Sequence, residues 1–441
     1  MIVRPHRLVL TAFALSLGLL AAPVQAASPV PPVEDAPLIP LEDNPKVVVD
    51  EVWQIVNQDF VGKNFDRERW TSQRAELLRQ RYDSRADAYR TINKLLKPLG
   101  DPYTRFLNPS DFAQLTSQTS GEISGVGLRL VLDKRSSELV VADALRNTPA
   151  AKAGVRPGDR LLRVNGKPTA LMTLEQASQE IQGEVGTEVS LQFSRPQGEV
   201  FTVTLKRVQI ELDTVAYSVK TEGNLRVGYI RLDEFSSHAA EQMKAAIEAL
   251  NQEQITGYVL DLRGNPGGLL FASVDIARMW LDQGEIVSTV DRRGGDRHFK
   301  ANQSKITSLP LVVLVDKYSA SASEILAGAL KEHGRATLVG TQTYGKGTVQ
   351  SVHSLSDGSG LAVTIARYYP PSGADINQKG ISPDVYEELS MDQALRLQQD
   401  PSLMGTSADP QYTKAVSVLQ RFQPPAFGQV KALPNPIGAR P

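Results

Sequence analysis

The sequence predicts an α/β protein with a helical amino-terminal region and an inserted module of short strands. Residues 47–118 carry apolar side chains three and four positions apart, which is the spacing of amphipathic helices. Residues 119–208 alternate short apolar runs with glycine-containing turns. Residues 209–390 repeat the order strand, helix, strand, which is typical of βαβ units in a sheet. We therefore expect three folded parts, the last of which is built from βαβ units.

The composition is that of an ordinary globular protein. Its 441 residues are 41% hydrophobic and 22% charged, and the formal net charge is −1. Without residues 1–26, which hold two of the 48 Lys and Arg and no acid, 46 basic residues face 49 acidic ones. This balance gives no basic footprint for nucleic acid. The absence of cysteine excludes disulfides, thiol catalysis and thiolate-bound zinc, and we predict no cofactor and no metal.

The first 26 residues have the pattern of a secretory signal peptide. Arg4 and Arg7 form a basic start, residues 8–20 are the apolar core, and residues 24–26 are a small-residue cleavage signature. The apolar run is shorter than the ~20 residues that a membrane span needs. We expect export, with no integral membrane segment in the mature chain.

Proline-rich segments are expected at both ends of the mature chain. Residues 27–46 contain six prolines, which predicts an extended leader. The tail, residues 391–441, has one helix candidate at residues 412–420 and a proline-rich end.

Ser321 is the candidate nucleophile. It follows the strand-like run Leu311–Val315 and precedes a helix-like segment, so it lies beyond the carboxyl end of a strand, where α/β proteins bind ligands. Backbone N–H groups at a helix start have no intrahelical partner and can face a developing oxyanion. However, Ser321 and Glu324 also spell a capping box, S-x-x-E, so this pair alone favours a helix cap.

Lys346 shifts the balance toward catalysis. It lies between Gly345 and Gly347, so its backbone can approach another element closely. A free lysine has a pKa of ~10.4, and a neutral amine at neutral pH requires a shift of roughly three units, or about 4 kcal/mol. Burial without a carboxylate partner supplies a shift of this size. Gln350 can hold the amine by a hydrogen bond without adding charge.

Residues 319–325, Ser-Ala-Ser-Ala-Ser-Glu-Ile, and residues 344–350, Tyr-Gly-Lys-Gly-Thr-Val-Gln, resemble motifs of the carboxyl-terminal processing peptidases. Those enzymes use a serine–lysine dyad. The resemblance implies that Ser321 is the nucleophile, Lys346 the base and Gln350 the residue that orients it. It also implies a crotonase/Clp-protease-like catalytic domain, which periodicity alone does not show.

Further site residues follow from the same resemblance. Glu324 and Glu332 lie on the nucleophile's helix, and Glu332 matches an acidic position proposed to matter in some members. The loop at residues 261–268 is implied to supply an oxyanion donor, which we place on the N–H of Gly267, paired with the N–H of Ala322. Without the resemblance, the glycines of this loop indicate only a tight turn.

The inserted module resembles a PDZ domain. Residues 157–166 match the strand and turn signature of that domain, and residues 174–181 read as its helix. Glycines expose successive N–H groups to a peptide's terminal carboxylate, while the peptide adds as a strand beside the domain's edge. The expected substrate-binding residues are Gly125, Val126, Gly127 and Leu128.

The helical region, with residues 101–107, is similar to the plant and cyanobacterial branch of these peptidases. This similarity implies an enzyme of the thylakoid lumen or periplasm. The expected partners are protein substrates with free carboxyl termini, and a candidate is the precursor of a photosystem II reaction-centre protein.

Three alternatives remain open on the sequence alone. Residues 340–346 fit the P-loop pattern, but Gly347 stands where a magnesium-binding Ser or Thr belongs. A PDZ scaffold with an inactive protease-like domain is the second alternative. The third is a Ser–His hydrolase, whose candidate histidines outside the signal peptide are His238, His298, His333 and His353.

Overall fold

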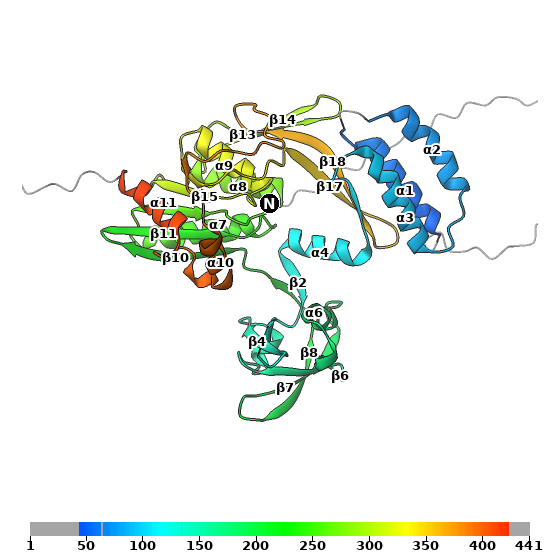
Figure 1. The fold of residues 1–441 in the computed structure, drawn as a ribbon, viewed down its shortest axis with the longest axis horizontal. Coiled ribbons are helices and arrows are strands. Elements are labelled where there is room, and N and C mark those ends of the chain that lie inside the picture. Colours follow the sequence, from blue (N-terminus) through cyan, green and yellow to red (C-terminus); the bar gives the residue numbers. More distant parts are fainter. Residues whose placement is uncertain (1–43, 63–64, 134, 423–441) are drawn as a thin grey trace, which may run out of the picture. The chain divides into compact units, whose positions relative to one another are not determined.

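The computed structural model describes residues 44–62, 65–133 and 135–422. The predicted signal peptide, most of the predicted leader and residues 423–441 of the tail lie outside these ranges. Figure 1 shows the course of the chain through them. None of the helices in the described ranges combines the length and apolar character needed to cross a bilayer.

Three helices form the amino-terminal region, as the apolar spacing predicts. They are α1 (Pro45–Asp59), α2 (Arg67–Arg79) and α3 (Arg85–Leu96), seen in blue in Figure 1. Helix α1 begins two residues before the expected start. Asn44 caps it by accepting the N–H of Lys46, and Pro45 fits the first turn, where an N–H has no intrahelical partner. The expected leader, residues 27–46, therefore extends too far, because its last two residues are helical.

The apolar faces of these helices pack on a strand from the far end of the sequence. Val49, Val52 and Ile92 are fully buried. They share a core with Leu361 and Val363 of β18 (Gly360–Tyr369). Burial of one such side chain contributes ~1.5–3 kcal/mol. The cluster thus holds the helical region against the sheet to which β18 belongs.

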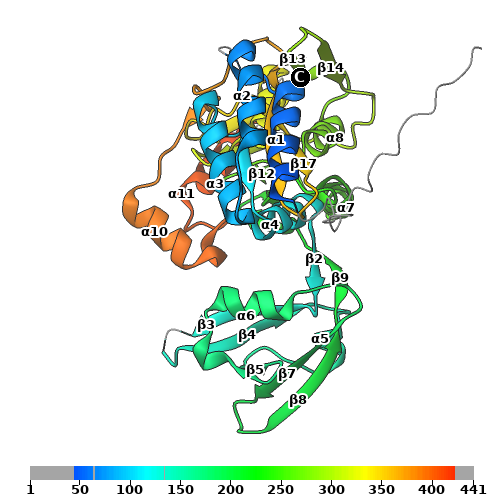
Figure 2. The same cartoon turned by 90° about the vertical axis from the view of Figure 1, so that its right-hand side faces the viewer.

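One two-stranded ribbon leads into and out of the inserted module. In it, β2 (Glu122–Gly125) pairs antiparallel with β9 (Val208–Glu211). Between them lies a sheet in the order β3-β4-β5-β7-β8, with β6 beside β5. Helix α6 packs against this sheet over the predicted residues, Leu174–Ile181 (Figure 2). The other elements of the module are β3 (Leu128–Asp133), β4 (Glu138–Ala144), α5 (Pro149–Lys152), β5 (Arg160–Val164), β6 (Lys167–Pro168), β7 (Glu188–Ser194) and β8 (Val200–Lys206).

The expected βαβ units form a sheet in the order β10-β11-β12-β15-β16-β19. All neighbours from β11 to β19 are parallel, and β10 is antiparallel to β11. The strands are β10 (Val215–Glu222), β11 (Leu225–Leu232), β12 (Gly257–Asp261), β15 (Leu311–Val315), β16 (Thr337–Gly340) and β19 (Val385–Tyr386).

Helices cover both faces of this sheet, which explains its unbroken apolar runs. Alternate residues of a strand point to opposite faces, and in β15 Val313 packs in one core while Val312 and Leu314 pack in another. The first core contains residues of α7 (Ala239–Gln252), α8 (Leu270–Trp280) and α9 (Ala322–Glu332). The second contains residues of α11 (Pro410–Gln420), the helix expected in the tail.

A second, antiparallel sheet lies beside the first core. Its order is β1-β18-β13-β14, and β17 pairs with β18. Residues 361–368 of β18 also have the apolar run of a strand in the sequence, whereas three of the other four strands are short or rich in polar side chains. The other four strands are β1 (Arg105–Leu107), β13 (Glu285–Asp291), β14 (Asp296–Lys300) and β17 (Thr348–Ser354).

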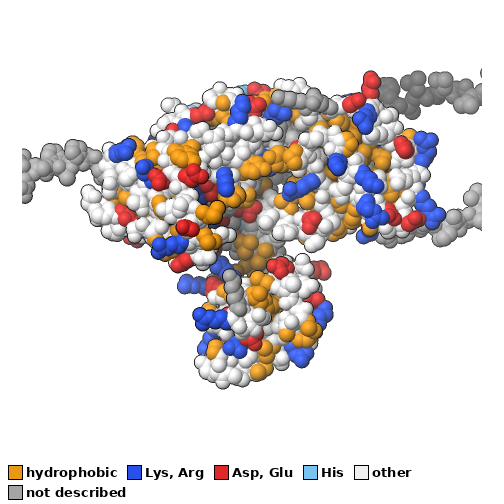
Figure 3. Space-filling model, viewed as in Figure 1, with side chains coloured by type: hydrophobic (Ala, Val, Ile, Leu, Met, Phe, Trp, Pro, Cys, Tyr) orange, Lys and Arg blue, Asp and Glu red, His pale blue; other side chains and the backbone are white. Residues whose placement is uncertain are grey.

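The remaining helices are α4 (Pro109–Ser120) and α10 (Met391–Gln399), with 3₁₀ turns at Lys97–Leu99, Thr169–Leu171 and Pro401–Leu403. On the face that Figure 3 shows, basic and acidic side chains are interspersed rather than gathered by sign.

Candidate active site

Ser321 occupies a strained turn between β15 and α9. Its φ of +54° and ψ of −112° lie outside the regions that L-residues ordinarily adopt. Such a conformation persists only where the surroundings enforce it. Here the hydroxyl of Ser319 donates to the carbonyl of Leu262 at 2.8 Å, and the hydroxyl of Tyr368 donates to the carbonyl of Ser321 at 3.1 Å. The turn is therefore held by hydrogen bonds to the loop after β12 and to strand β18.

A single buried carboxylate joins the serine turn to the lysine loop. Glu324 Oε2 accepts the N–H groups of Ser321 and Lys346, both at 2.9 Å. Its Oε1 accepts the hydroxyl of Thr343 at 2.6 Å and the N–H of Gly345 at 2.7 Å. Burial raises the pKa of this carboxyl, whereas the four hydrogen bonds lower it. Glu324 is fully buried and does not line the active-site cavity. These contacts suit a residue that positions the two segments, whereas the sequence predicts a catalytic role for Glu324.

Lys346 combines partial burial with the absence of an ion pair. No carboxylate in the described ranges forms one with it, and its Nζ lies 5.0 Å from the ring centroid of Tyr103. Burial lowers the pKa of the Lys346 ammonium, and the charge of Arg105 lowers it further, while Asp101 and Glu324 act in the opposite sense. This environment favours the neutral amine that a general base requires.

One cavity of about 500 Å³ brings the predicted residues together. Its walls come from β1, α4, the loop before α8, the start of α9, β17 and β18. They include Ser321, Lys346, Gln350, Gly267 and Ala322, together with Tyr103, Arg105, Gly268 and Tyr368. Tyr103 and Arg105 belong to a segment from which sequence analysis drew only family resemblance.

Gln350 lines the cavity but does not contact the lysine in the expected way. Its amide donates to the hydroxyls of Thr348 at 2.9 Å and Thr364 at 3.3 Å. Thr364 in turn donates to Asp101 at 2.6 Å. The predicted hydrogen bond from Gln350 to Lys346 is absent, because the threonines hold its amide.

Of the two N–H groups expected to bind the oxyanion, that of Gly267 is not available and that of Ala322 is. The N–H of Gly267 donates to Asn265 Oδ1 at 2.8 Å, so it is already used. Glycine is still needed there. Its φ is +105°, and an added Cβ would lie 2.9 Å from the Cβ of Ser321. Gly267 therefore permits a close approach rather than donating, and Ala322 keeps a first-turn N–H at the start of α9.

Gly268 supplies a second backbone donor. The carbonyl of Gly267 and the N–H of Leu269 both bond to Phe235. Because successive peptide groups alternate in direction along an extended chain, the N–H of Gly268 points away from Phe235. Within the described ranges no acceptor takes it, and Gly268 lines the cavity.

Glu332 lies outside the site. It is the exposed last residue of α9, roughly 16 Å of helix from Ser321 at ~1.5 Å per residue. Its carboxylate accepts the N–H and hydroxyl of Ser372. The structure therefore does not bring Glu332, for which the resemblance implies a catalytic role, to the cavity of Ser321.

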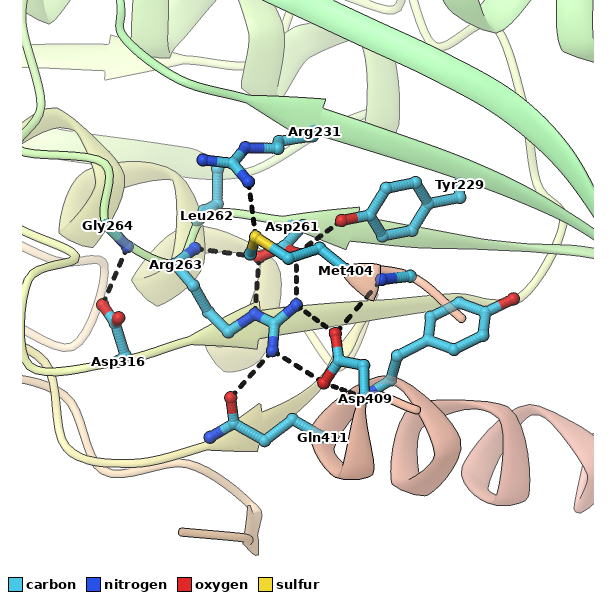
Figure 4. A network of polar contacts seen from close by, with 12 residues as sticks. Tyr229, Arg231, Asp261, Leu262, Arg263, Gly264, Asp316, Met404, Asp409 and Gln411 are labelled. Carbon is cyan, nitrogen blue, oxygen red and sulfur yellow. Dashed lines mark hydrogen bonds and ion pairs between the residues drawn. The ribbon is translucent and has the colours of Figure 1, made fainter. Parts of the chain in front are cut away.

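A buried charge network anchors the loop that carries Gly267 (Figure 4). Arg263 donates to Asp261 at 2.6 and 2.9 Å and to Asp409 at 2.7 and 3.0 Å. It also donates to Gln411 Oε1 at 2.9 Å, while Tyr229 donates to Asp261 at 2.7 Å. The network thus connects the loop after β12 to the start of α11. Sequence analysis missed it.

The PDZ-like loop has the features of a carboxylate site. Gly127 has a φ of +84°, and an added Cβ would meet the side chain of Thr148 at 2.2–2.5 Å. The N–H groups of Val126 and Gly127 have no backbone acceptor within the described ranges. Next to them, β3 with Leu128 forms the edge of its sheet, which leaves one side free for a peptide strand.

The structure decides against two of the alternatives. Residue Gly347 leads into strand β17, whereas a P-loop leads into a helix. The four candidate histidines pair with groups elsewhere and none lines the cavity of Ser321: His238 with Glu122, His298 with Glu285, His333 with the Glu285 carbonyl and His353 with Asp59. Over the described ranges, no three His, Cys, Asp or Glu side chains group as ligands for one metal.

Comparison with known proteins places the chain in a family. Peptidase family S41 matches residues 226–387, and the PDZ domain matches residues 140–195. A carboxyl-terminal-processing protease of Picosynechococcus is 40% identical over 377 residues, covering 85% of this chain and 89% of that protein. The chain is a carboxyl-terminal-processing protease of family S41. It therefore belongs to the serine proteases, as the sequence motifs predicted.

Two further relatives support this membership of the processing proteases. The Synechocystis carboxyl-terminal-processing protease is 42% identical over 334 residues, covering 75% of this chain and 78% of that one. The solved structure of a photosystem II D1 C-terminal processing protease is 36% identical with a TM-score of 0.51, covering 83% of this chain and 99% of that one. The predicted fold class, α/β with an inserted PDZ domain, is confirmed.

The position of Glu324 generates the first prediction. Glu324→Gln places an amide NH₂ against N–H donors, so we expect kcat to fall at least tenfold and stability to fall by about 1–3 kcal/mol. Peptide hydrolysis and urea unfolding measure these changes. The matched control is Glu332→Gln on the same helix, which should keep kcat within about twofold. Equal activities of the two variants would contradict the positioning role of Glu324.

Proposed function

We propose that this protease removes carboxyl-terminal extensions from proteins with Ser321 as nucleophile and Lys346 as general base. The observation that carries the proposal is that both residues line one cavity, while Glu324 binds the backbone N–H of each. The serine sits on a strained turn before a helix and the lysine in a site that favours its neutral form.

Formation of the acyl-enzyme needs two proton transfers, and its hydrolysis by water needs two more. As Ser321 Oγ attacks the scissile carbonyl carbon, the amine of Lys346 takes the hydroxyl proton. The N–H groups of Ala322 and Gly268 would stabilise the oxyanion, helped by the positive end of the α9 dipole. When the C–N bond breaks, the lysine returns its proton to the leaving amine. Water then hydrolyses the ester, with the same lysine as base.

The PDZ domain would select the substrate by its terminus. The N–H groups of Val126 and Gly127, which have no backbone acceptor among the residues that the structure describes, suit a carboxylate, and the free edge of β3 suits an extended peptide. The substrate's end would bind here while an internal bond is cleaved at Ser321.

We further propose an exported enzyme of the thylakoid lumen or periplasm that matures a photosystem II reaction-centre precursor. The similarity to the photosystem II D1 C-terminal processing protease supports this substrate. Relatives in cyanobacteria and in Arabidopsis chloroplasts support the compartment.

Substitution of the dyad tests the proposed chemistry. Ser321→Ala and Lys346→Ala should each reduce kcat/KM by at least about 10³-fold, and the double variant should be little worse than either, since the two residues act as one unit. Circular dichroism should show folded proteins throughout. A Lys346→Ala variant with most of its activity would identify another base.

The charge of Arg105 gives a prediction on pH. Activity should rise with pH as the lysine loses its proton. Because Arg105 lowers the pKa of Lys346, Arg105→Gln should raise that pKa and move the rising limb to higher pH by on the order of half a unit. Arg105→Lys keeps the charge and serves as the control. Coincident pH–rate profiles for Gln and wild type would show that Arg105 does not act on the lysine.

The PDZ loop predicts dependence on the substrate's terminal charge. Amidation of a peptide substrate's carboxyl terminus should lower kcat/KM by roughly five- to hundredfold, the range of couplings of ~1–3 kcal/mol. Excess of a short uncleavable peptide with a free apolar terminus should reduce the difference by competition. If acid and amide were cleaved equally, the recognition would lie outside the loop.

A further inference from the structure

A second cavity of about 400 Å³ adjoins the one that contains Ser321. Its walls come from the end of α1, the start of α8, the β13–β14 hairpin and the sheet strands β17 and β18. The two cavities share five lining residues: Leu270, Phe271, Val349, Ser351 and Ile365. Since the same side chains line both, the two cavities are adjacent.

Strand β17 provides a path between the two cavities. Among the described strands it pairs only with β18, so its other edge is open. It begins two residues after Lys346, and its residues 348–352 all line the active-site cavity. An extended peptide can pair with such an edge through its backbone. A substrate strand that follows β17 from the dyad would run past Val349 and Ser351, which line both cavities.

Part of the apolar lining of the second cavity is exposed rather than buried in the core. Phe271 is 65% exposed, although it opens a helix whose other apolar residues are mostly buried. Its ring meets that of Phe299 edge to face, with centroids 5.7 Å apart. Together the two rings present an apolar surface to whatever enters, and such pairs commonly contact apolar side chains of a ligand.

The charged part of the cavity has more cations than available anions. Arg292, Arg293 and Arg297 line it with Asp59 and Asp291. Within the described ranges none of the three arginines forms an ion pair. Asp291 Oδ1 accepts the N–H groups of Gly295 and Arg293, and these bonds together with the charges of Arg293 and Arg297 hold the pKa of this carboxyl below its usual value.

Arg292 is held in place, unlike the other two arginines. Its guanidinium donates to the carbonyl of Asn57 at 2.8 Å. Burial lowers its pKa, and the neighbouring charges of Arg67 and Arg293 lower it further, while those of Asp59 and Asp291 act in the opposite sense. Three arginines line the cavity against two aspartates, which leaves one positive charge in excess that an incoming carboxylate would neutralise.

We propose that this cavity is a substrate subsite that binds an acidic side chain, with an apolar neighbour, at a fixed distance from the scissile bond. The subsite rests on the proposed function, because its occupant is the protein segment that continues from the active site. Arg293 and Arg297 bind the carboxylate, and Phe271 and Phe299 contact the apolar side chain. This subsite would select substrates by a side chain near the scissile bond, independently of the PDZ domain's recognition of the terminal carboxylate.

The test uses amidated peptides, so that the PDZ loop has no terminal carboxylate to bind. Glu and Gln are exchanged at each of several positions on both sides of the cleavage point. Affinity for the Ser321→Ala protein is measured by fluorescence anisotropy, and kcat/KM is measured with the parent enzyme. At one position, Glu should bind about tenfold more tightly than Gln, as expected for a charge-assisted hydrogen bond, and high salt should reduce the difference.

Substitution of Arg293 and Arg297 tests whether the preference for Glu over Gln arises in the second cavity. In Arg293→Gln/Arg297→Gln, the affinities for the Glu and Gln peptides should converge, whereas the exposed Arg396→Gln of α10 should keep the parent's difference. A preference that survives the double substitution, or no preference at any position, would overturn the subsite. Absence of Ser321-dependent hydrolysis alone would count against the proposed function, since peptide binding to Ser321→Ala still tests the subsite.

Discussion

The active site depends on the four hydrogen bonds that the buried carboxylate of Glu324 accepts. Two come from the loop before β17, through Thr343 and Gly345, and two come from the backbones of Ser321 and Lys346. Burying a carboxylate costs several kcal/mol unless donors surround it. Here every donor belongs to one of the two segments that carry the dyad. The carboxylate is satisfied only when those segments lie side by side, so the stability of this part of the core also sets the geometry of the site.

The strained turn at Ser321 follows from the same arrangement. A positive φ at a residue with a Cβ is unfavourable, and the turn keeps it because hydrogen bonds fix its N–H, its carbonyl and the preceding Ser319. On the opposite side, Gly267 removes the side chain that would collide with Ser321. Strain in one loop and a missing side chain in the other bring two backbone segments together at the nucleophile.

The elements that the sequence predicted best are those marked by a short local signal, such as a fully apolar run or a helix cap. Strand β15 and helix α6 have the expected bounds, since all of the β15 side chains are buried and α6 carries a capping box. Strands β1, β14 and β17 of the second sheet carry no clear pattern, because they are short or rich in polar side chains. The pairing of Arg263 with Asp409 joins residues 146 apart in sequence, which no local pattern reports.

Within the site, motifs predicted which residues meet but not every bond between them. Ser321, Lys346 and Gln350 line one cavity, yet the amide of Gln350 is held by two threonines that carry no motif. The S-x-x-E pattern indicated a helix cap, and the Glu324 carboxylate does accept the N–H of Ser321. Its second role, on the lysine loop, depends on a tertiary contact. The roles of the dyad residues stay predictions.

Two of the residues that bind Arg263, Asp409 and Gln411, are synthesised about 146 residues after it. A ribosome releases Asp409 and Gln411 only after every other part of the site has emerged. Until then, Arg263 lacks two of its three acceptor residues, and the loop that carries Gly267 lacks its anchor. The active site of such a protease would be complete only after residues 409–411 have been made, which would limit cleavage of other proteins by shorter, unfinished chains.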